Sequence, residues 1–172
     1  MICKDFLLIL ILILFLQNCD HGLEPPKEND PALIHGAISG TITYQNWPPA
    51  DSLKDLRLIV FKQYPPTNIF LAVTSGQAIV FPPIGTSEGL PINVDLFIYN
   101  MDIPAGTYEY VVVAQQFGDN VTSDWRAVGQ YDTTGTGLDS IPTLINISSN
   151  QLLENINIKV DFNHIPYQPF VE

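Results

Sequence analysis

One segment has the letters of a catalytic motif. Residues 85–89 read GTSEG, which matches the G-x-S-x-G pattern with Ser87 as the nucleophile. In that motif the serine occupies a sharp turn between a strand and a helix, at the top of an α/β sheet. Here Pro83 and Pro91 flank the pattern and a strand-like run follows, so no helix can begin where the mechanism needs one. We interpret the segment as a loop and expect a protein that is not an enzyme and has no catalytic residue.

Metal and cofactor chemistry has little support. The three histidines, His21, His35 and His164, show no H-x-H or H-E-x-x-H spacing, which argues against a zinc site. Residues 132–139 (DTTGTGLD) form an oxygen-rich, glycine-rich segment of the kind that calcium accepts, but without the alternating acidic spacing of an EF-hand. An ordinary hairpin loop is the simpler interpretation. We expect no metal and no cofactor.

Aromatic side chains raise the question of carbohydrate binding, because aromatic rings stack on the apolar faces of sugars. The candidate ligand-binding residues are Trp47, which prolines and polar residues surround, with Tyr44 and Tyr64. Trp125 begins a strand-like run and is predicted to be buried. Aromatic residues of a β-protein more often pack in the core, and this alternative stays open.

Composition excludes some partners. The chain has 172 residues, a hydrophobic fraction of 46% and a formal net charge of −11, so it can form a core and is not a disordered acidic tail. Binding to nucleic acid needs clustered Lys and Arg. The few basic residues are scattered, and we expect no nucleic-acid partner. Both cysteines, Cys3 and Cys19, lie near the N-terminus, so the folded part has no disulfide.

The N-terminus carries an export signal. Residues 6–16 are an unbroken apolar run, too short for a comfortable membrane span and preceded by Lys4, as in a secretory signal. Residues 16–19 (LQNC) resemble the lipobox of bacterial lipoproteins, although Asn18 stands where a small residue is usual. The resemblance implies that residues 1–19 are a signal segment and that Cys19 is lipidated and anchors the protein to a membrane of a bacterial cell envelope, periplasmic or surface-exposed. An uncleaved anchor and an ordinary secreted protein are the alternatives.

The rest of the chain divides into three parts. Residues 20–35 are polar and proline-rich, which predicts a tether. Residues 36–165 alternate strand-like runs with turn signals at intervals of roughly ten residues, which is typical of an all-β sandwich or barrel. Residues 166–172 are predicted to be a C-terminal tail. No segment shows an amphipathic helical stripe of useful length.

The central prediction is a hairpin over residues 91–117. Two runs with period-two alternation flank a turn that contains Pro104 and Gly106. We expect them to pair, with one face of each buried. The alternating residues are Ile92, Val94, Leu96 and Ile98 in the first run and Tyr108, Tyr110, Val112 and Ala114 in the second.

Further strands are predicted on either side. In residues 37–44 we expect Ile38, Ile42 and Tyr44 on one face, with Gly40 marking a bulge or a close backbone approach. In residues 152–162 we expect Ile156, Ile158, Val160 and Phe162 on one face, with Asn155, Asn157, Lys159 and Asp161 on the other. Residues 69–73 and 77–81 are expected to form a hairpin through Ser75 and Gly76. The remaining predicted strands are 56–61, 125–131 and 144–147.

Residues 38–44 (ISGTITY) and 104–113 (PAGTYEYVVV) together resemble prealbumin-like (transthyretin-like) sandwiches, and more narrowly the carboxypeptidase-regulatory-like modules of bacterial envelope proteins. Immunoglobulin-like sandwiches use a similar turn, in which a tyrosine such as Tyr108 hydrogen-bonds back to the backbone. Residues 69–89 are longer than such modules usually need. The resemblance implies a single antiparallel Greek-key β-sandwich with a non-catalytic binding or structural role, and a protein or glycan partner.

Overall fold

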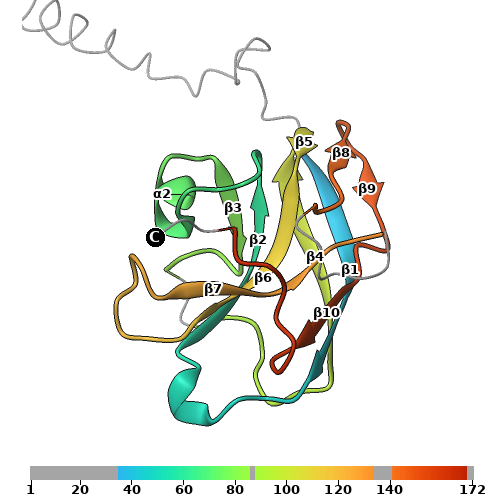
Figure 1. The fold of residues 1–172 in the computed structure, drawn as a ribbon. Helices are drawn as coiled ribbons and strands as arrows, with labels where there is room; N and C mark the ends of the chain where they lie inside the picture. The colour runs from blue at the N-terminus through green and yellow to red at the C-terminus, as the bar shows by residue number, and fades with distance from the viewer. Residues whose placement is uncertain (1–34, 86–87, 134–140, 170–172) are drawn as a thin grey trace, which may run out of the picture. The chain divides into compact units, whose positions relative to one another are not determined.

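The computed structural model describes residues 35–85, 88–133 and 141–169, all of which belong to the compact unit Leu33–Glu172. The predicted signal segment with Cys19, nearly all of the predicted tether, Ser87 and most of the oxygen-rich segment 132–139 lie outside the described residues. Within the described ranges most of the regular elements are β-strands, and the helices are the α-helix α2 (Ile69–Thr74) and the 3-10 helix η2 (Ala50–Ser52) (Figure 1). No described helix has the length and apolar character needed to cross a membrane.

The first sheet is built around β1 (His35–Gln45), which is the longest strand. β1 pairs antiparallel with β4 (Leu96–Pro104) on one side. On its other side it pairs in parallel with β9 (Leu152–Leu153) and then β10 (Ile158–Asp161), which follow one another along the same edge. The prediction of a purely antiparallel fold is therefore wrong for this sheet, which is mixed.

The second sheet is antiparallel throughout and has the strand order β3-β2-β6-β7. Its strands are β3 (Ala78–Phe81), β2 (Asp55–Phe61), β6 (Tyr110–Gln116) and β7 (Trp125–Gln130). A separate short pair joins β5 (Gly106–Tyr108) to β8 (Ile145–Ile147).

The main core lies between the two sheets. The predicted inner face of β1 is confirmed, since Ile38, Ile42 and Tyr44 are all buried in this core. The close approach predicted at Gly40 is also confirmed, because a Cβ there would overlap the backbone of Ile156. Of the residues predicted to share one face in the last segment, Ile156, Ile158 and Val160 are buried, and Phe162 is partly buried against the same core.

A second apolar cluster covers the opposite face of the second sheet, so that every residue of β6 is buried. Part of this cover is α2, in the segment where we predicted one strand of a hairpin, and that prediction is wrong. The Asn68 side chain accepts a hydrogen bond from the Leu71 backbone N–H at 3.0 Å and caps the helix. Only residues 78–81 of the predicted second strand form a strand, β3, and it pairs with β2.

The predicted central hairpin is also wrong, because β4 and β6 belong to different sheets. The turn after Pro104 carries the chain from one sheet to the other rather than back along β4. Tyr108 stabilises this crossover as predicted, since its hydroxyl donates to the Pro104 carbonyl at 2.8 Å. The buried face of β4 is the opposite one to that expected. Leu96 and Ile98 are 51% and 72% exposed, and the buried residues are Tyr99, Met101 and Ile103.

The start of the segment predicted as a tail contacts the domain. The Gln168 side chain forms two hydrogen bonds with the backbone of Ala127 in β7, donating to its carbonyl and accepting from its N–H, both at 2.9 Å. Pro166 and Pro169 are buried. Residues 166–169 therefore close one edge of the second sheet.

Candidate functional site

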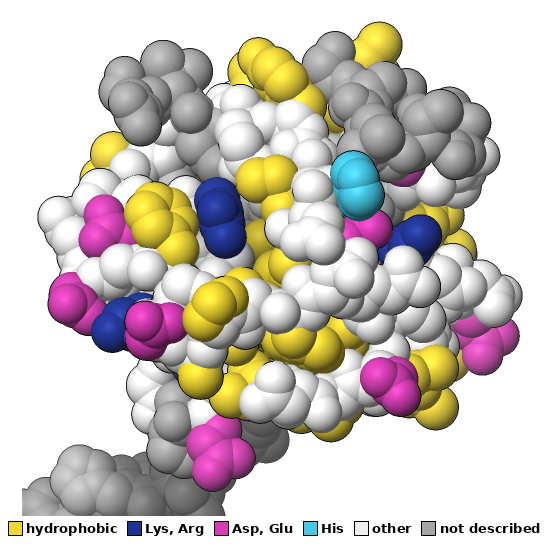
Figure 2. All heavy atoms as spheres, turned by 60° about the horizontal axis from the view of Figure 1, so that its bottom comes forward, with side chains coloured by type: hydrophobic (Ala, Val, Ile, Leu, Met, Phe, Trp, Pro, Cys, Tyr) yellow, Lys and Arg dark blue, Asp and Glu magenta, His cyan; other side chains and the backbone are white. Residues whose placement is uncertain are grey.

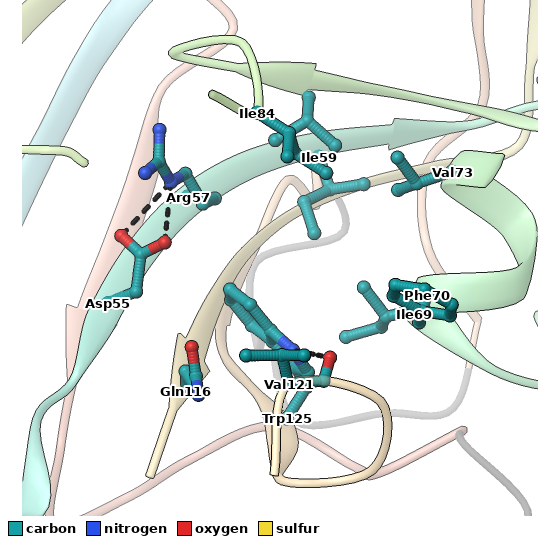
Figure 3. Close-up of a pocket in the computed structure, with 11 residues that line it drawn as sticks. Asp55, Arg57, Ile59, Ile69, Phe70, Val73, Ile84, Gln116, Val121 and Trp125 are labelled. Carbon is teal, nitrogen blue, oxygen red and sulfur yellow. Dashed lines mark hydrogen bonds and ion pairs between the residues drawn. The ribbon is translucent and has the colours of Figure 1, made fainter. Parts of the chain in front are cut away.

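The described residues form an apolar pocket of about 250 Å³ on the outer face of the second sheet (Figure 3). Ile59 of β2 and Ile69 of α2 are buried and form its inner part. Phe70, Ile84 and Val121 are exposed and surround its opening. A cavity of about 150 Å³ with a similar lining can hold benzene. The pocket therefore has room for a larger apolar group.

One ion pair closes the end of the pocket (Figure 3). The Arg57 Nε donates to both carboxylate oxygens of Asp55, at 2.7 and 3.0 Å, and an Nη donates to the carbonyls of Pro82 and Glu88 at 3.0 and 3.2 Å. Arg57 is buried and the pair neutralises itself. It ties β2 to the segment around the opening and leaves the pocket without net charge.

Trp125 forms another wall of the pocket. Its indole Nε1–H donates to the Val121 carbonyl at 2.9 Å, which holds the loop before β7 against the ring (Figure 3). The Asn68 side chain donates to the Thr122 carbonyl at 3.2 Å, so the residue that caps α2 also fixes this loop. Helix, loop and sheet are thus joined around the pocket by hydrogen bonds.

A larger and more polar cleft, of about 690 Å³, adjoins the pocket. Ile69 and Trp125 line both spaces. The other lining residues come from the α2 cap, the loop before β7, β7 itself and the C-terminal segment; they are Thr67, Asn68, Phe117, Thr122, Ser123, Asp124, Arg126 and Gln168.

The structure does not join the three predicted ligand-binding aromatics into an exposed platform. Trp47 stacks between Tyr44 and Phe162, with ring centroids 4.8 and 4.9 Å apart, and its Nε1–H donates to the Val94 carbonyl at 3.0 Å. Tyr44 is buried in the main core. Tyr64 packs edge-on against Tyr110 in the second cluster. Their rings are thus used in packing, and a ligand-binding role for them stays a prediction.

The other chemistry-bearing residues also lie apart. His35 is exposed at the start of β1, while His164 Nδ1 lies 3.1 Å from Asp161 Oδ2. Asn46 donates to Asp161 Oδ1 at 2.8 Å, and these hydrogen bonds, Asn46 first, lower the pKa of Asp161 to about 2. No group of three potential metal ligands occurs in the described part of the chain.

Sequence reasoning missed the residues that form the pocket. They come from strand, helix and two loops far apart in the chain, and none belongs to a motif. The sequence offered one signal for this region. Trp125 and Arg126 place an aromatic residue beside one of the two arginines in the chain, a combination that is common at binding sites.

The surface around these features has a mixed character. On the face in Figure 2 the Lys and Arg side chains stand apart from one another, some of them beside Asp or Glu, and hydrophobic side chains gather in a broken band across the middle. Such scattered positive charge differs from the basic stripe that a nucleic-acid site presents.

Comparisons with known proteins give little. No protein-family model matches the chain, and no curated protein matches it. Among solved structures, a leucine-rich repeat protein from Bacteroides thetaiotaomicron is similar to 76% of this chain, at 12% identity and a TM-score of 0.35. The match covers 14% of that protein's chain, and at this score it supports no argument about function.

Proposed function

We propose that this chain is a lipid-anchored protein of a bacterial cell envelope, and that its β-domain binds an apolar group of a ligand or partner without catalysis. The observation that supports binding is the pocket between α2, the second sheet and the loop before β7. Apolar pockets with a few fixed polar groups are the usual form of small-ligand sites.

The proposal excludes catalysis because of how the polar groups in the pocket are used. Asp55 and Arg57 neutralise one another at 2.7 Å, and the Gln116 amide donates to the Gly118 carbonyl at 2.9 Å. Chemistry at such a site would need a nucleophile beside a base that is free to accept its proton. Binding needs only the apolar walls that the pocket provides.

Binding is tested with a neutral hydrophobic dye, N-phenyl-1-naphthylamine, whose fluorescence rises in apolar surroundings. We expect saturable binding by the purified domain, which Ile84→Asp abolishes because it places a charge at the opening of the pocket. Ile98→Asp is the matched control, since Ile98 is equally exposed on β4 of the other sheet. Absence of saturable binding, or equal binding by the two variants, would refute the proposed pocket function.

For the fold, we propose a Greek-key sandwich of the prealbumin-like or immunoglobulin-like kind. Two observations support it: the two sheets share one core, and the Tyr108 hydroxyl bonds back to the Pro104 carbonyl, four residues earlier, as in a tyrosine corner. An experimental structure with a different strand connectivity would overturn this assignment.

The anchor is a separate part of the proposal. Residues 16–19 support it through their resemblance to a lipobox, and acyl chains gain about 0.8 kcal/mol for each CH2 buried in a bilayer. Mass spectrometry of the mature protein, expressed in a bacterium, tests it directly. A chain that starts at Cys19 with added acyl mass is expected, and an intact Met1 or an unmodified Cys19 would contradict the proposal.

Carbohydrate binding is the second candidate function. One observation favours it, in the polar cleft rather than at the aromatic residues predicted from the sequence. Phe117 is 43% exposed in the polar cleft, beside Trp125 and several hydroxyl and amide side chains. A glycan array probed with the domain and a Phe117→Ala variant tests this role. Sugar binding that survives in the variant would move the site elsewhere.

A further inference from the structure

Arg126 is held in place on two sides by the protein. Its Nε donates to the Oε1 of Gln115 at 3.0 Å, and its guanidinium lies 5.6 Å from the centre of the Phe117 ring. Gln115 is itself completely buried, and its Nε2 donates to the Ser52 carbonyl at 2.7 Å. This chain of contacts fixes the arginine from the interior outward.

The terminal nitrogens of Arg126 have no partner among the described residues. Arginine carries five N–H donors, and only the Nε–H is used here. The other arginine, Arg57, binds a carboxylate and two carbonyls and is buried. Arg126 therefore differs from Arg57 in presenting a fixed guanidinium whose Nη1 and Nη2 groups remain available.

The neighbouring polar groups do not compete strongly for it. Asp124 also lines the cleft, but its Oδ1 accepts from the Ser123 hydroxyl at 2.8 Å and its Oδ2 from the Asn120 N–H at 2.9 Å. Gln168 uses both ends of its amide on the backbone. Arg126 is thus the one cation among the described residues that line the cleft, beside hydroxyl and amide groups and the hydrogen-bonded Asp124 carboxylate.

We propose that Arg126 receives the carboxylate of an amphiphilic ligand whose apolar part enters the adjoining pocket. Nη1 and Nη2 of one guanidinium match the two oxygens of a carboxylate, and such charge-assisted pairs are stronger than neutral hydrogen bonds. The cleft and the pocket adjoin one another at Ile69 and Trp125, which line both spaces. This inference rests on the proposed pocket function and adds the chemical class of the ligand.

The first test uses the unaltered domain and compares two ligands that differ only in their head group. Octanoate and octanamide have the same apolar chain, and each is titrated against the domain containing bound N-phenyl-1-naphthylamine. We expect octanoate to displace the dye at about tenfold lower concentration, equivalent to about 1.4 kcal/mol. Equal displacement by the acid and the amide would overturn the role of Arg126 while leaving the pocket intact.

The second test removes the charge. Arg126→Gln should lose the preference for octanoate and bind the dye as before, which shows that the fold and pocket persist. Lys159→Gln is the control, because it removes the same charge from the exposed face of β10. A preference that survives in Arg126→Gln, or is lost equally in Lys159→Gln, would refute the proposal.

Two sources of such a carboxylate are distinguished by adding a short peptide with an apolar C-terminal residue, in its free-acid and amidated forms. Displacement by the free acid alone, at lower concentration than octanoate, assigns the site to a chain terminus. Displacement by octanoate at lower concentration than by the free-acid peptide assigns the site to free fatty acids. Failure of the dye itself to bind would refute the proposed function rather than this inference alone.

Discussion

The buried tyrosines provide a sharp test of how hydrogen bonding supports this fold. Tyr99 and Tyr108 are almost fully buried, and both hydroxyls donate to backbone carbonyls. Tyr99 bonds to Ile156 at 2.7 Å and joins β4 to the segment before β10, while Tyr108 bonds to Pro104 at 2.8 Å. A buried hydrogen bond of this kind contributes about 1 kcal/mol to stability. Tyr99→Phe and Tyr108→Phe should each lower the free energy of unfolding by that amount.

Tyr44 and Tyr110 are equally buried, but their hydroxyls have no hydrogen-bond partner among the described residues. A buried hydroxyl without a partner costs about 1–3 kcal/mol. Removing the hydroxyl oxygen leaves the Tyr44 ring packed against Trp47 and the Tyr110 ring packed against Phe61. Tyr110→Phe and Tyr44→Phe should therefore leave stability unchanged or raise it by about 1 kcal/mol.

Urea unfolding followed by circular dichroism measures these differences through the transition midpoint, at constant slope. In thermal unfolding each 1 kcal/mol corresponds to about 3 °C for a domain of this size. Tyr108→Phe should therefore lose stability and Tyr110→Phe should not, although both variants remove one oxygen atom. If the two variants lose stability equally, the assignment of hydrogen-bonded and unpartnered hydroxyls is refuted.

Alkaline pH gives the same series a second readout. Burial raises the pKa of Tyr44, Tyr99, Tyr108 and Tyr110 above the ordinary value of 10.0. In the unfolded chain these groups ionise at their ordinary pKa, whereas the folded chain keeps them neutral. Stability is therefore fully present below pH 10 and falls as the pH rises above it. Tyr110→Phe should make this fall shallower in urea titrations between pH 9 and 11.

Three further predictions concern other parts of the fold. Gly40→Ala should destabilise the domain by about 2–3 kcal/mol in urea unfolding, because its Cβ would overlap backbone, whereas Gly106→Ala, whose Cβ meets only ordinary contacts, should change stability by less than about 1 kcal/mol. The lowered pKa of Asp161 contributes stability that is present above the unfolded pKa of about 4 and is lost as the pH falls through about 2. Asn46→Ala should therefore reduce the loss of unfolding free energy between about pH 4 and pH 2, measured by urea unfolding. An unchanged loss would contradict the role of the Asn46 hydrogen bond in lowering this pKa. Asn68→Ala should cost about 1 kcal/mol, measured by thermal unfolding, and should also weaken dye binding, since it removes both the α2 cap and the bond to the loop before β7.

The sequence best predicted which face of a strand is buried where apolar and polar residues alternate, so that one face is apolar and the other polar. In β1 and in the last strands this held, and Ile38, Ile42 and Ile158 are buried as expected. β4 has apolar residues on both faces, since Leu96 and Ile98 lie on its exposed face while Met101 and Ile103 lie on its buried face. Periodicity alone cannot choose between two apolar faces, and the wrong one was selected.

Pairing partners were harder to predict than strands. A Pro-x-Gly turn shows that the chain changes direction, but it does not show whether the next strand returns to the same sheet. Here the next long strand, β6, belongs to the other sheet, and the hydrogen bond from Tyr108 to Pro104 stabilises the turn that leads to it. The helix Ile69–Thr74 was missed because six residues are too few to show a helical stripe, and its start depends on the Asn68 cap. The pocket depends on this helix and on loop placement, so sequence reasoning did not find it.

The parallel pairing of β1 with β10 has a consequence for how the chain reaches its native state. β1 is the first strand, yet Ile42 pairs with Phe97 on one side and with Ile158 on the other. The order of the first sheet therefore depends on contacts between segments far apart in the chain, which are slow to form. While the chain is being synthesised, β1 has no strand to pair with until the second half emerges. A chain of this design cannot complete its first sheet until residues 158–161 have been synthesised, so this sheet forms later than one built from strands that are neighbours in the sequence.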